Sequence, residues 1–348
     1  MNSGQATFTS AVTDFETAVR ARDAGASGAA FGLLQQTFHD ADDTELAAVA
    51  PRLAEFLPEV PLGPRAVVAV VIGAAVERGA DPVVCAPTVL AGVGEALAGA
   101  EEFAARWAAT GGGDLPDPER TDPEDAVFDR VGQPATEAWW TLPQWEMAAV
   151  AVLNHKPVRV ALADRTALID AAERVGDATG GGLKYLRYML AVLDDEPLVV
   201  LHRGTGTGYR VRISGLGDNF QLHTLLAGEL VGGGHVPGDA PEAAAVAACR
   251  SGASGAPGTE GALDTTGSFD LAAADGTRVW NEGIPADIPA VEGVRVLVLD
   301  PPSYARAWSA GRLFSHMPGE LVLEAVLPAE EAAGWLARTA PALSARGA

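Results

Sequence analysis

Five consecutive segments decide the fold of the C-terminal part of this chain: Leu198–Arg203 (LVVLHR), Gly204–Gly208 (GTGTG), Tyr209–Ser214 (YRVRIS), Gly215–Asn219 (GLGDN) and Phe220–Val231 (FQLHTLLAGELV). The first begins with a continuous apolar run, Leu198–Leu201, and the third alternates apolar residues with arginines, which is the period of a β-strand. The second has three glycines in five residues, so it favours a tight turn and predicts a β-hairpin. The fifth has leucines at helical spacing and predicts a helix after a short loop.

The rest of the C-terminal part adds strands to this hairpin. Val294–Leu299 (VRVLVL) is the strongest strand pattern in the chain, and its apolar run predicts burial on both faces of a sheet. Shorter strand patterns lie at Phe269–Ala273, Arg278–Trp280 and Leu321–Leu327, and a helix is predicted at Glu330–Arg338. We therefore expect residues 137–348 to form a mixed α/β domain with a β-hairpin and a central sheet.

Residues 1–110 have helical periodicity almost throughout. Apolar residues recur three or four positions apart, as in Leu46, Val49 and Leu53, and glycines and prolines separate the periodic stretches. Pro51 lies inside one such stretch and predicts a kink or a break. The pattern predicts an all-α domain, which is either a helical bundle or a short helical-repeat module, although no fixed repeat period is present. The fold class is thus multi-domain, α followed by α+β.

Residues 111–136 differ in composition from both flanks. They include four prolines and the acidic residues Asp114, Asp117, Glu119, Asp122, Glu124, Asp125 and Asp129. With few apolar residues to pack, this stretch is predicted to be an acidic linker between the two domains. Trp139, Trp140 and Trp145 follow it directly. They either seal the second domain or its contact with the first, or form the aromatic wall of a ligand site, and both interpretations stay open.

Composition limits the classes of function. The 348 residues carry a net charge of −22, and 48% of them are hydrophobic, which is typical of a globular protein. Nucleic acids and anionic membranes attract positive charge, so neither is expected as a partner. The first residues lack a signal-peptide pattern, and the longest apolar run, Ala66–Val76, is too short to span a bilayer. We expect a cytoplasmic protein, and its arginine-rich, alanine-rich composition suggests a bacterial one.

Strong catalytic and cofactor motifs are missing from the sequence. It contains no phosphate-binding loop, no His-Glu-x-x-His, no Cys-x-x-Cys and no Gly-x-Ser-x-Gly pattern. The two cysteines, Cys85 and Cys249, are far apart and predict buried thiols rather than a metal site or a disulfide. We therefore expect no cofactor and no bound metal.

An anion site is the leading prediction for the C-terminal domain. Asp218 and Gln221 fit a helix cap, but Gly215, Gly217 and Asn219 could instead leave free amides at the helix N-terminus for an anion. Residues 155–212 hold nine basic and seven acidic side chains, against the acidic trend of the chain. The expected ligand-binding residues are Arg203, Arg210, Gly215, Gly217, Asn219, Trp280 and Asn281.

Two functions remain in competition. The first is a cytoplasmic binding or regulatory protein, with a helical interaction module and an α/β domain that binds an anionic small molecule or an acidic peptide. The alternative is a metal-independent enzyme in which His223 works with Asp218 or Glu282 as an acid–base pair on a small anionic substrate. A metal enzyme ranks third, since the histidines and acids lack the spacing of metal ligands.

Overall fold

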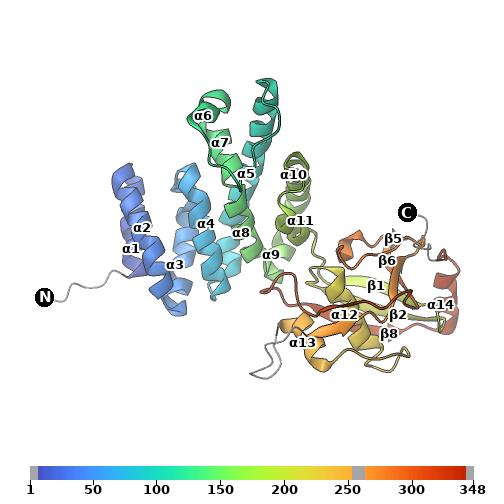
Figure 1. Ribbon diagram of the computed structural model, residues 1–348. Helices are drawn as coiled ribbons and strands as arrows, with labels where there is room; N and C mark the ends of the chain where they lie inside the picture. The colour runs from blue at the N-terminus through green and yellow to red at the C-terminus, as the bar shows by residue number, and fades with distance from the viewer. Residues whose placement is uncertain (1–6, 253–262, 342–348) are drawn as a thin grey trace. The chain divides into compact units, whose positions relative to one another are not determined.

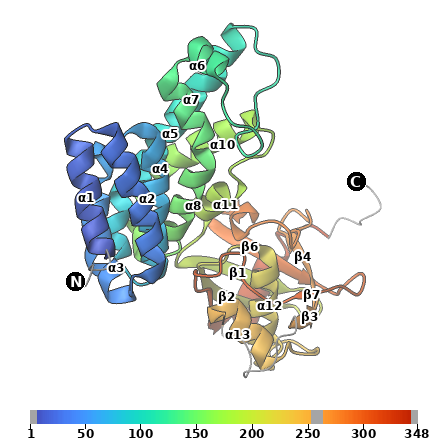
Figure 2. The same ribbon diagram turned by 60° about the vertical axis from the view of Figure 1, so that its left-hand side comes forward.

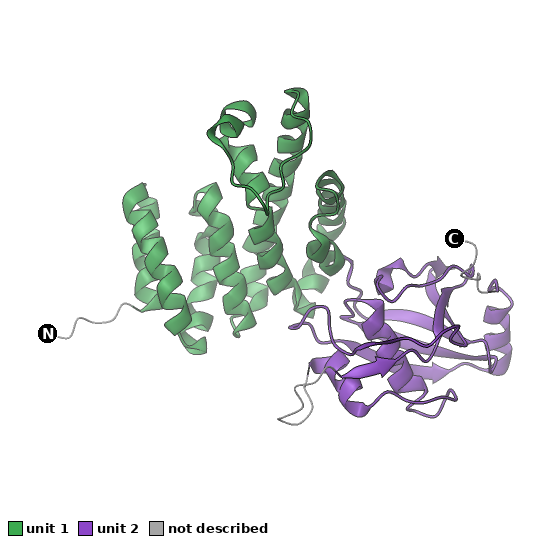
Figure 3. Cartoon of the chain, in the orientation of Figure 1, with its two compact units in different colours: residues 1–190 green, residues 191–348 purple. Residues whose placement is uncertain are grey.

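The computed structural model (Figure 1) describes residues 7–252 and 263–341. It divides into two compact units, residues 1–190 and residues 191–348 (Figure 3). The predicted fold class is confirmed, because unit 1 is all-α and unit 2 is a mixed sheet with helices and a β-hairpin.

Unit 1 is an array of α-helices. Their bounds are α1 (Phe8–Arg20), α2 (Ala24–Asp40), α3 (Asp43–Phe56), a short 3₁₀ turn η1 (Leu57–Glu59), α4 (Leu62–Glu77), α5 (Pro82–Ala109), α6 (Asp125–Val131), α7 (Gln133–Trp140), α8 (Leu142–Leu153), α9 (Lys156–Ala161), α10 (Arg165–Ala178) and α11 (Lys184–Ala191). Figures 1 and 2 show the first helices side by side, with α1 against α2 and α3 against α4. The chain is not divided at Pro51, which lies inside α3.

Helix α5 is the central helix of unit 1. Asp81 caps its first amides, Pro82 occupies its first turn, and Phe103 and Leu97 are buried on it. Among the described residues, α5 is the one helix long and apolar enough to cross a membrane by length and composition. Half of its most apolar window is buried inside the protein, and core helices pass the same test.

The acidic stretch 111–136 lies within unit 1, and the division into units falls after Leu190 instead. The tryptophans explain why a stretch with few apolar residues packs here. The indole N–H of Trp139 donates to the carbonyl of Pro116 at 2.9 Å, and that of Trp140 donates to the carbonyl of Thr121. Trp139 also stacks on Phe103 of α5, with ring centroids 4.8 Å apart. Backbone hydrogen bonds to buried rings thus replace apolar side chains as anchors.

Unit 2 is built on one mixed sheet, with strands in the order β4-β6-β1-β2-β8 and β5 paired to β6. The strands of this sheet are β1 (Glu196–His202), β2 (Thr207–Ser214), β4 (Asp270–Ala273), β5 (Ala290–Val291), β6 (Val294–Asp300) and β8 (Glu320–Val326). β3 (Asp264–Thr266) and β7 (Ala307–Ser309) form a separate pair. The helices are α12 (Asn219–Leu230), α13 (Ala243–Ser251), η2 (Pro285–Asp287) and α14 (Ala329–Leu336).

The predicted hairpin is present, since β1 and β2 pair antiparallel. The predicted buried strand is also present, since β6 lies parallel to β1 in the middle of the sheet. The strand predicted at Arg278–Trp280 is reduced to one bridge between Ala272 and Arg278. The chain turns away after it because the carbonyl of Trp280 accepts a hydrogen bond from the Asn219 side chain.

The alternation in β2 places two kinds of side chain on two faces of the sheet. Tyr209, Val211 and Ile213 are buried in one core together with the leucines of α12. The opposite face is covered by α14, and Arg210 points there to pair with Glu331. The period-two pattern therefore separates the arginines of β2 from α12.

Candidate functional site

The amides around the start of α12, where an anion was predicted, already have partners inside unit 2. The Asp218 carboxylate accepts from the amide of Gln221 at 2.8 Å, and the Gln221 side chain accepts from the amide of Gly217 at 2.9 Å. The amides of Asn219 and Gly215 donate to the carbonyls of Gly283 and Leu193. Asp218 is thus a helix cap, and no free row of amides faces a ligand here.

The predicted arginine ligands are paired with acids that come later in the chain. Arg203 donates to Asp300 at 2.7 Å and to the carbonyl of Ala340 at 2.9 Å. Arg210 pairs with Glu331 and Arg212 with Glu324. Their positive charge is therefore balanced in the folded protein, away from the start of α12.

His223 lies in the core of unit 2. Its side chain is 0% exposed, and its Nε2 atom accepts a hydrogen bond from the amide of Ser268 at 3.1 Å. Burial and the positive charge of Arg306 lower the pKa of His223 to about 4. Asn281 lies beside the ring and raises that pKa slightly, but its amide atoms and His223 Nδ1 make no hydrogen bond of ordinary geometry with the described residues.

The residues of the predicted acid–base pair therefore have separate environments. Asp218 is engaged as the α12 cap, and burial raises the pKa of its carboxyl. Glu282 is exposed on the surface. A neutral imidazole that solvent does not reach offers no contact to a dissolved substrate.

Two other predicted residues do meet. The Asn219 side chain donates to the Trp280 carbonyl at 2.8 Å, and both residues line a cleft of 170 Å³ in unit 2. Arg278, which was not among the predicted residues, lies in the same cleft.

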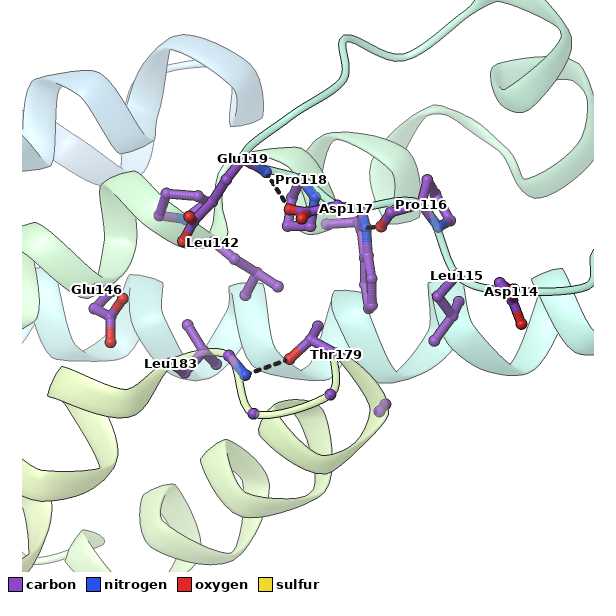
Figure 4. A pocket seen from close by; sticks show the side chains of 16 residues that line it. Asp114, Leu115, Pro116, Asp117, Pro118, Glu119, Leu142, Glu146, Thr179 and Leu183 are labelled. Carbon is purple, nitrogen blue, oxygen red and sulfur yellow. Dashed lines mark hydrogen bonds between the residues drawn. The ribbon is translucent and has the colours of Figure 1, made fainter.

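Unit 1 contains a cavity of 500 Å³ that is lined by four carboxylates, and we call it the acidic cavity. Its walls come from residues 114–119, from the ends of α7 and α8, and from the turn between α10 and α11 (Figure 4). The side chains that line it are Asp114, Leu115, Pro116, Asp117, Pro118, Glu119, Trp139, Leu142, Pro143, Glu146, Ala178, Thr179 and Leu183, with Gly180, Gly181 and Gly182.

The charged side chains that line the acidic cavity, among the described residues, are all carboxylates. Asp114, Asp117, Glu119 and Glu146 are present, and the lining residues within the described ranges include no lysine, arginine or histidine. Asp117 has an ion pair with Arg120 at 3.1 Å, but the Arg120 side chain is 83% exposed and lies outside the lining. The cavity therefore has a negative potential that a cation would relieve.

Glu146 is the most perturbed of these carboxylates. Burial raises the pKa of its carboxyl, the amides of Leu186 and Tyr185 lower that pKa by donating hydrogen bonds, and the charge of Glu119 raises it again. The hydrogen bond from the Leu186 amide is 2.9 Å long. Glu146 thus joins α8 to the first turn of α11, in a place where burial and a second carboxylate both disfavour its charged form.

The floor of the cavity is apolar and fixed. Trp139 is 1% exposed and is held by its stacking on Phe103, and Figure 4 shows Leu142 and Leu183 facing the same space. The turn Gly180–Gly182 also lines the cavity, and Gly180 and Gly181 have φ of +71° and +106°. Glycine adopts this backbone without strain, which explains the glycines at these two positions.

The sequence held one signal for this site. Seven acids alternate with prolines at 114–129, and a tryptophan pair follows within a few residues. From the sequence, this stretch is predicted to be a solvated linker, in which the acidic side chains would face water and line no cavity. The tryptophan hydrogen bonds that hold the stretch in unit 1 are long-range contacts, and composition does not reveal them. Comparisons of this chain with protein-family models, with curated proteins and with solved structures find no match, so its function is inferred from these residues alone.

Proposed function

We propose that this is a binding protein, cytoplasmic and bacterial, whose helical unit binds a cationic group of an organic ligand in the acidic cavity. The observation that carries the proposal is a 500 Å³ cavity whose charged lining residues are carboxylates only. Its volume is within the range of small-molecule sites, which is about 300–1,000 Å³. A ligand with an ammonium or guanidinium group would supply the missing positive charge.

An extended organic cation fits the lining better than a metal ion. Among residues 7–252 and 263–341, no three His, Cys, Asp or Glu side chains are close enough together to hold a metal. The carboxylates are instead spread around an apolar floor that includes Trp139 and Leu142. A polyamine presents several charges along an apolar chain, which matches this distribution.

Binding of spermidine, measured by isothermal titration calorimetry at fixed ionic strength, tests the proposal. The informative variant is Glu146→Gln, which removes a charge but keeps an oxygen that accepts from the amides of Leu186 and Tyr185. A charge-assisted hydrogen bond contributes about 1.5–3 kcal/mol, so the affinity should fall about tenfold or more.

Glu55→Gln is the matched control. Glu55 is exposed on α3 and is not a lining residue, so this variant has the same change in net charge without touching the cavity. Its affinity should be close to that of the wild type, because exposed charges distant from a site are screened by salt. Equal losses in the two variants would reduce the effect to non-specific attraction, and no saturable binding by the wild type would refute the proposal.

A further inference from the structure

Unit 2 contains a second cleft with a different chemistry, which we call the α12 cleft. It has a volume of 170 Å³ and is lined by Asn219, Asp275, Arg278, Trp280 and Asp287, together with Ala273, Thr277, Val279, Gly283 and Pro289. Unlike the acidic cavity, it carries charges of both signs. It lies at the turn of residues 280–283, which packs on the start of α12.

Asn219 builds this turn. Its backbone amide donates to the carbonyl of Gly283 at 2.9 Å, and its side-chain Nδ2 donates to the carbonyl of Trp280 at 2.8 Å. The amide of Val279 donates to the carbonyl of Leu271 at 2.9 Å, so the preceding residues are fixed on β4. Trp280 and Arg278 are therefore held in place by backbone contacts.

One side of the α12 cleft offers acceptors. Asn219 is 1% exposed, and its Oδ1 atom has no hydrogen-bond partner among the described residues. A Cβ atom added to Gly283 would lie 3.2 Å from Asp287 Oδ2, which accepts from the amide of Ile284, and 3.3 Å from Asn219 Nδ2, so these two side chains are neighbours across this glycine. An amide oxygen and a carboxylate together suit an ammonium group, which has three donors and no acceptor.

The other side offers donors. The Nε atom of Arg278 has no partner among the described residues, and its Nη2 atom lies 3.4 Å from Asp270 Oδ1. That same oxygen is 2.8 Å from Arg306, which is the shorter of the two ion pairs. One carboxylate is thus shared by two guanidinium groups, and Arg278 keeps donor capacity for a second carboxylate.

Aromatic rings complete the wall. The Arg278 guanidinium carbon lies 4.7 Å from the centroid of Trp280 and 5.3 Å from that of Tyr304, so the side chain is held between two rings. Trp280 is 56% exposed, which leaves apolar ring surface open at the cleft.

We propose that the α12 cleft binds a free α-amino acid with a small apolar side chain. Arg278 would receive its carboxylate, Asn219 and Asp287 its ammonium group, and Trp280 its side chain. The cleft is smaller than a typical drug-sized pocket and holds about six water volumes, which limits the ligand to this size. A zwitterion matches a lining with both signs of charge, whereas a simple anion would face Asp275 and Asp287.

The test measures binding of L-leucine to the full chain by calorimetry, next to two relatives that each lack one charge. L-leucinamide lacks the carboxylate and N-acetyl-L-leucine lacks the ammonium group. Both should bind at least about tenfold more weakly than L-leucine, because each leaves one charged side of the cleft unpaired. Arg278→Gln should weaken L-leucine about tenfold, and Arg278→Lys, which keeps the charge, should weaken it less.

Arg338→Gln is the matched control variant. Arg338 also stacks on a tryptophan of unit 2, 5.2 Å from the centroid of Trp335, and also has an ion pair, with Glu292 at 2.8 Å, but it does not line the cleft. Its affinity for L-leucine should equal that of the wild type. The proposal is overturned if L-leucine shows no saturable binding up to about 10 mM, if the two relatives bind as well as L-leucine, or if Arg278→Gln and Arg338→Gln behave alike. Spermidine binding does not enter this comparison, so the two sites are tested independently.

Discussion

Replacing Glu146 with glutamine separates the structural role of this residue from its charge. Glutamine keeps an oxygen for the amides of Leu186 and Tyr185, and it removes the charge that burial and Glu119 destabilise. We therefore expect Glu146→Gln to be as stable as the wild type at pH 7, or more stable by less than about 1 kcal/mol, since the group is partly exposed and its interactions are screened. Alanine at this position removes both the hydrogen-bond acceptor and the charge.

Glu146→Ala should be clearly destabilising. It removes the acceptor of the 2.9 Å hydrogen bond from Leu186 and leaves two amides at the start of α11 without a partner. An unsatisfied buried group costs about 1–3 kcal/mol, and water reaches this one in part, so the expected loss is about 2 kcal/mol. Unit 1 spans residues 1–190. Treated as one cooperative unit of that size, it should lose about 4–8 °C in Tm.

Urea unfolding followed by circular dichroism between pH 4 and pH 7 measures both effects. The pKa of Glu146 is raised in the folded protein. The stability linked to this shift is therefore fully present below the unfolded pKa of about 4.3 and is lost as the pH rises through the folded value. The difference between Glu146→Gln and the wild type should thus grow in favour of the variant as the pH rises.

A stability difference that runs in the opposite direction would refute this account of Glu146. If Glu146→Gln were less stable than the wild type at pH 7 and equal to it at pH 4, the charged carboxylate would be stabilising. Groups of the protein itself would then stabilise the negative charge of Glu146, and the proposal of a cationic ligand would lose its physical basis.

Substitutions at three further positions test other parts of the structure. Asp218→Ala should cost about 1 kcal/mol of unfolding free energy through the lost cap, and Asp218→Asn should cost less, because asparagine also caps helices. The pKa of His223 is lowered from 6.5 to about 4, so wild-type stability should fall by about 3 kcal/mol as the pH drops through this window, and His223→Phe should lack this dependence in urea titrations. Trp139→Phe keeps an aromatic ring but loses the hydrogen bond to Pro116 and part of the buried indole, which should cost at least about 1 kcal/mol and speed proteolysis within residues 114–124.

Local pattern was sufficient for the hairpin, the central strand and the α12 helix of unit 2, but not for Arg278–Trp280, where the predicted strand is one bridge. The alternation in Tyr209–Ile213 and the apolar run in Val294–Leu299 predicted strands because burial on one or two faces determines which residues a strand can carry. The glycines at 204–208 predicted the turn, and Asp218 the helix cap. Each of these features depends on residues close together in sequence.

The sites were harder to predict because they depend on which charged side chains form ion pairs with residues distant in the sequence. Arg203 and Arg210 looked available in sequence, yet Asp300 and Glu331, about a hundred residues away, neutralise them. No sequence pattern distinguishes Arg278, because a single arginine in a predicted strand is ordinary. Trp280 and Asn219, which line the same cleft, were predicted as ligand-binding residues, but Arg278 was not.

The sites that we propose for ligands are places where charged side chains lack a full set of ion-pair partners. The number of charges in a stretch of sequence does not identify such places. Asp270 accepts from both Arg278 and Arg306, and the shorter bond goes to Arg306. Of the four carboxylates of the acidic cavity, Asp117 has an ion pair with Arg120, whose side chain is exposed and lies outside the lining. Arg210 and Arg212 of β2, in contrast, each have an ion pair with an acid of the same unit. We therefore expect the proposed ligands to gain more free energy at these two sites than at Arg203, Arg210 or Arg212, where binding would first have to break an existing ion pair.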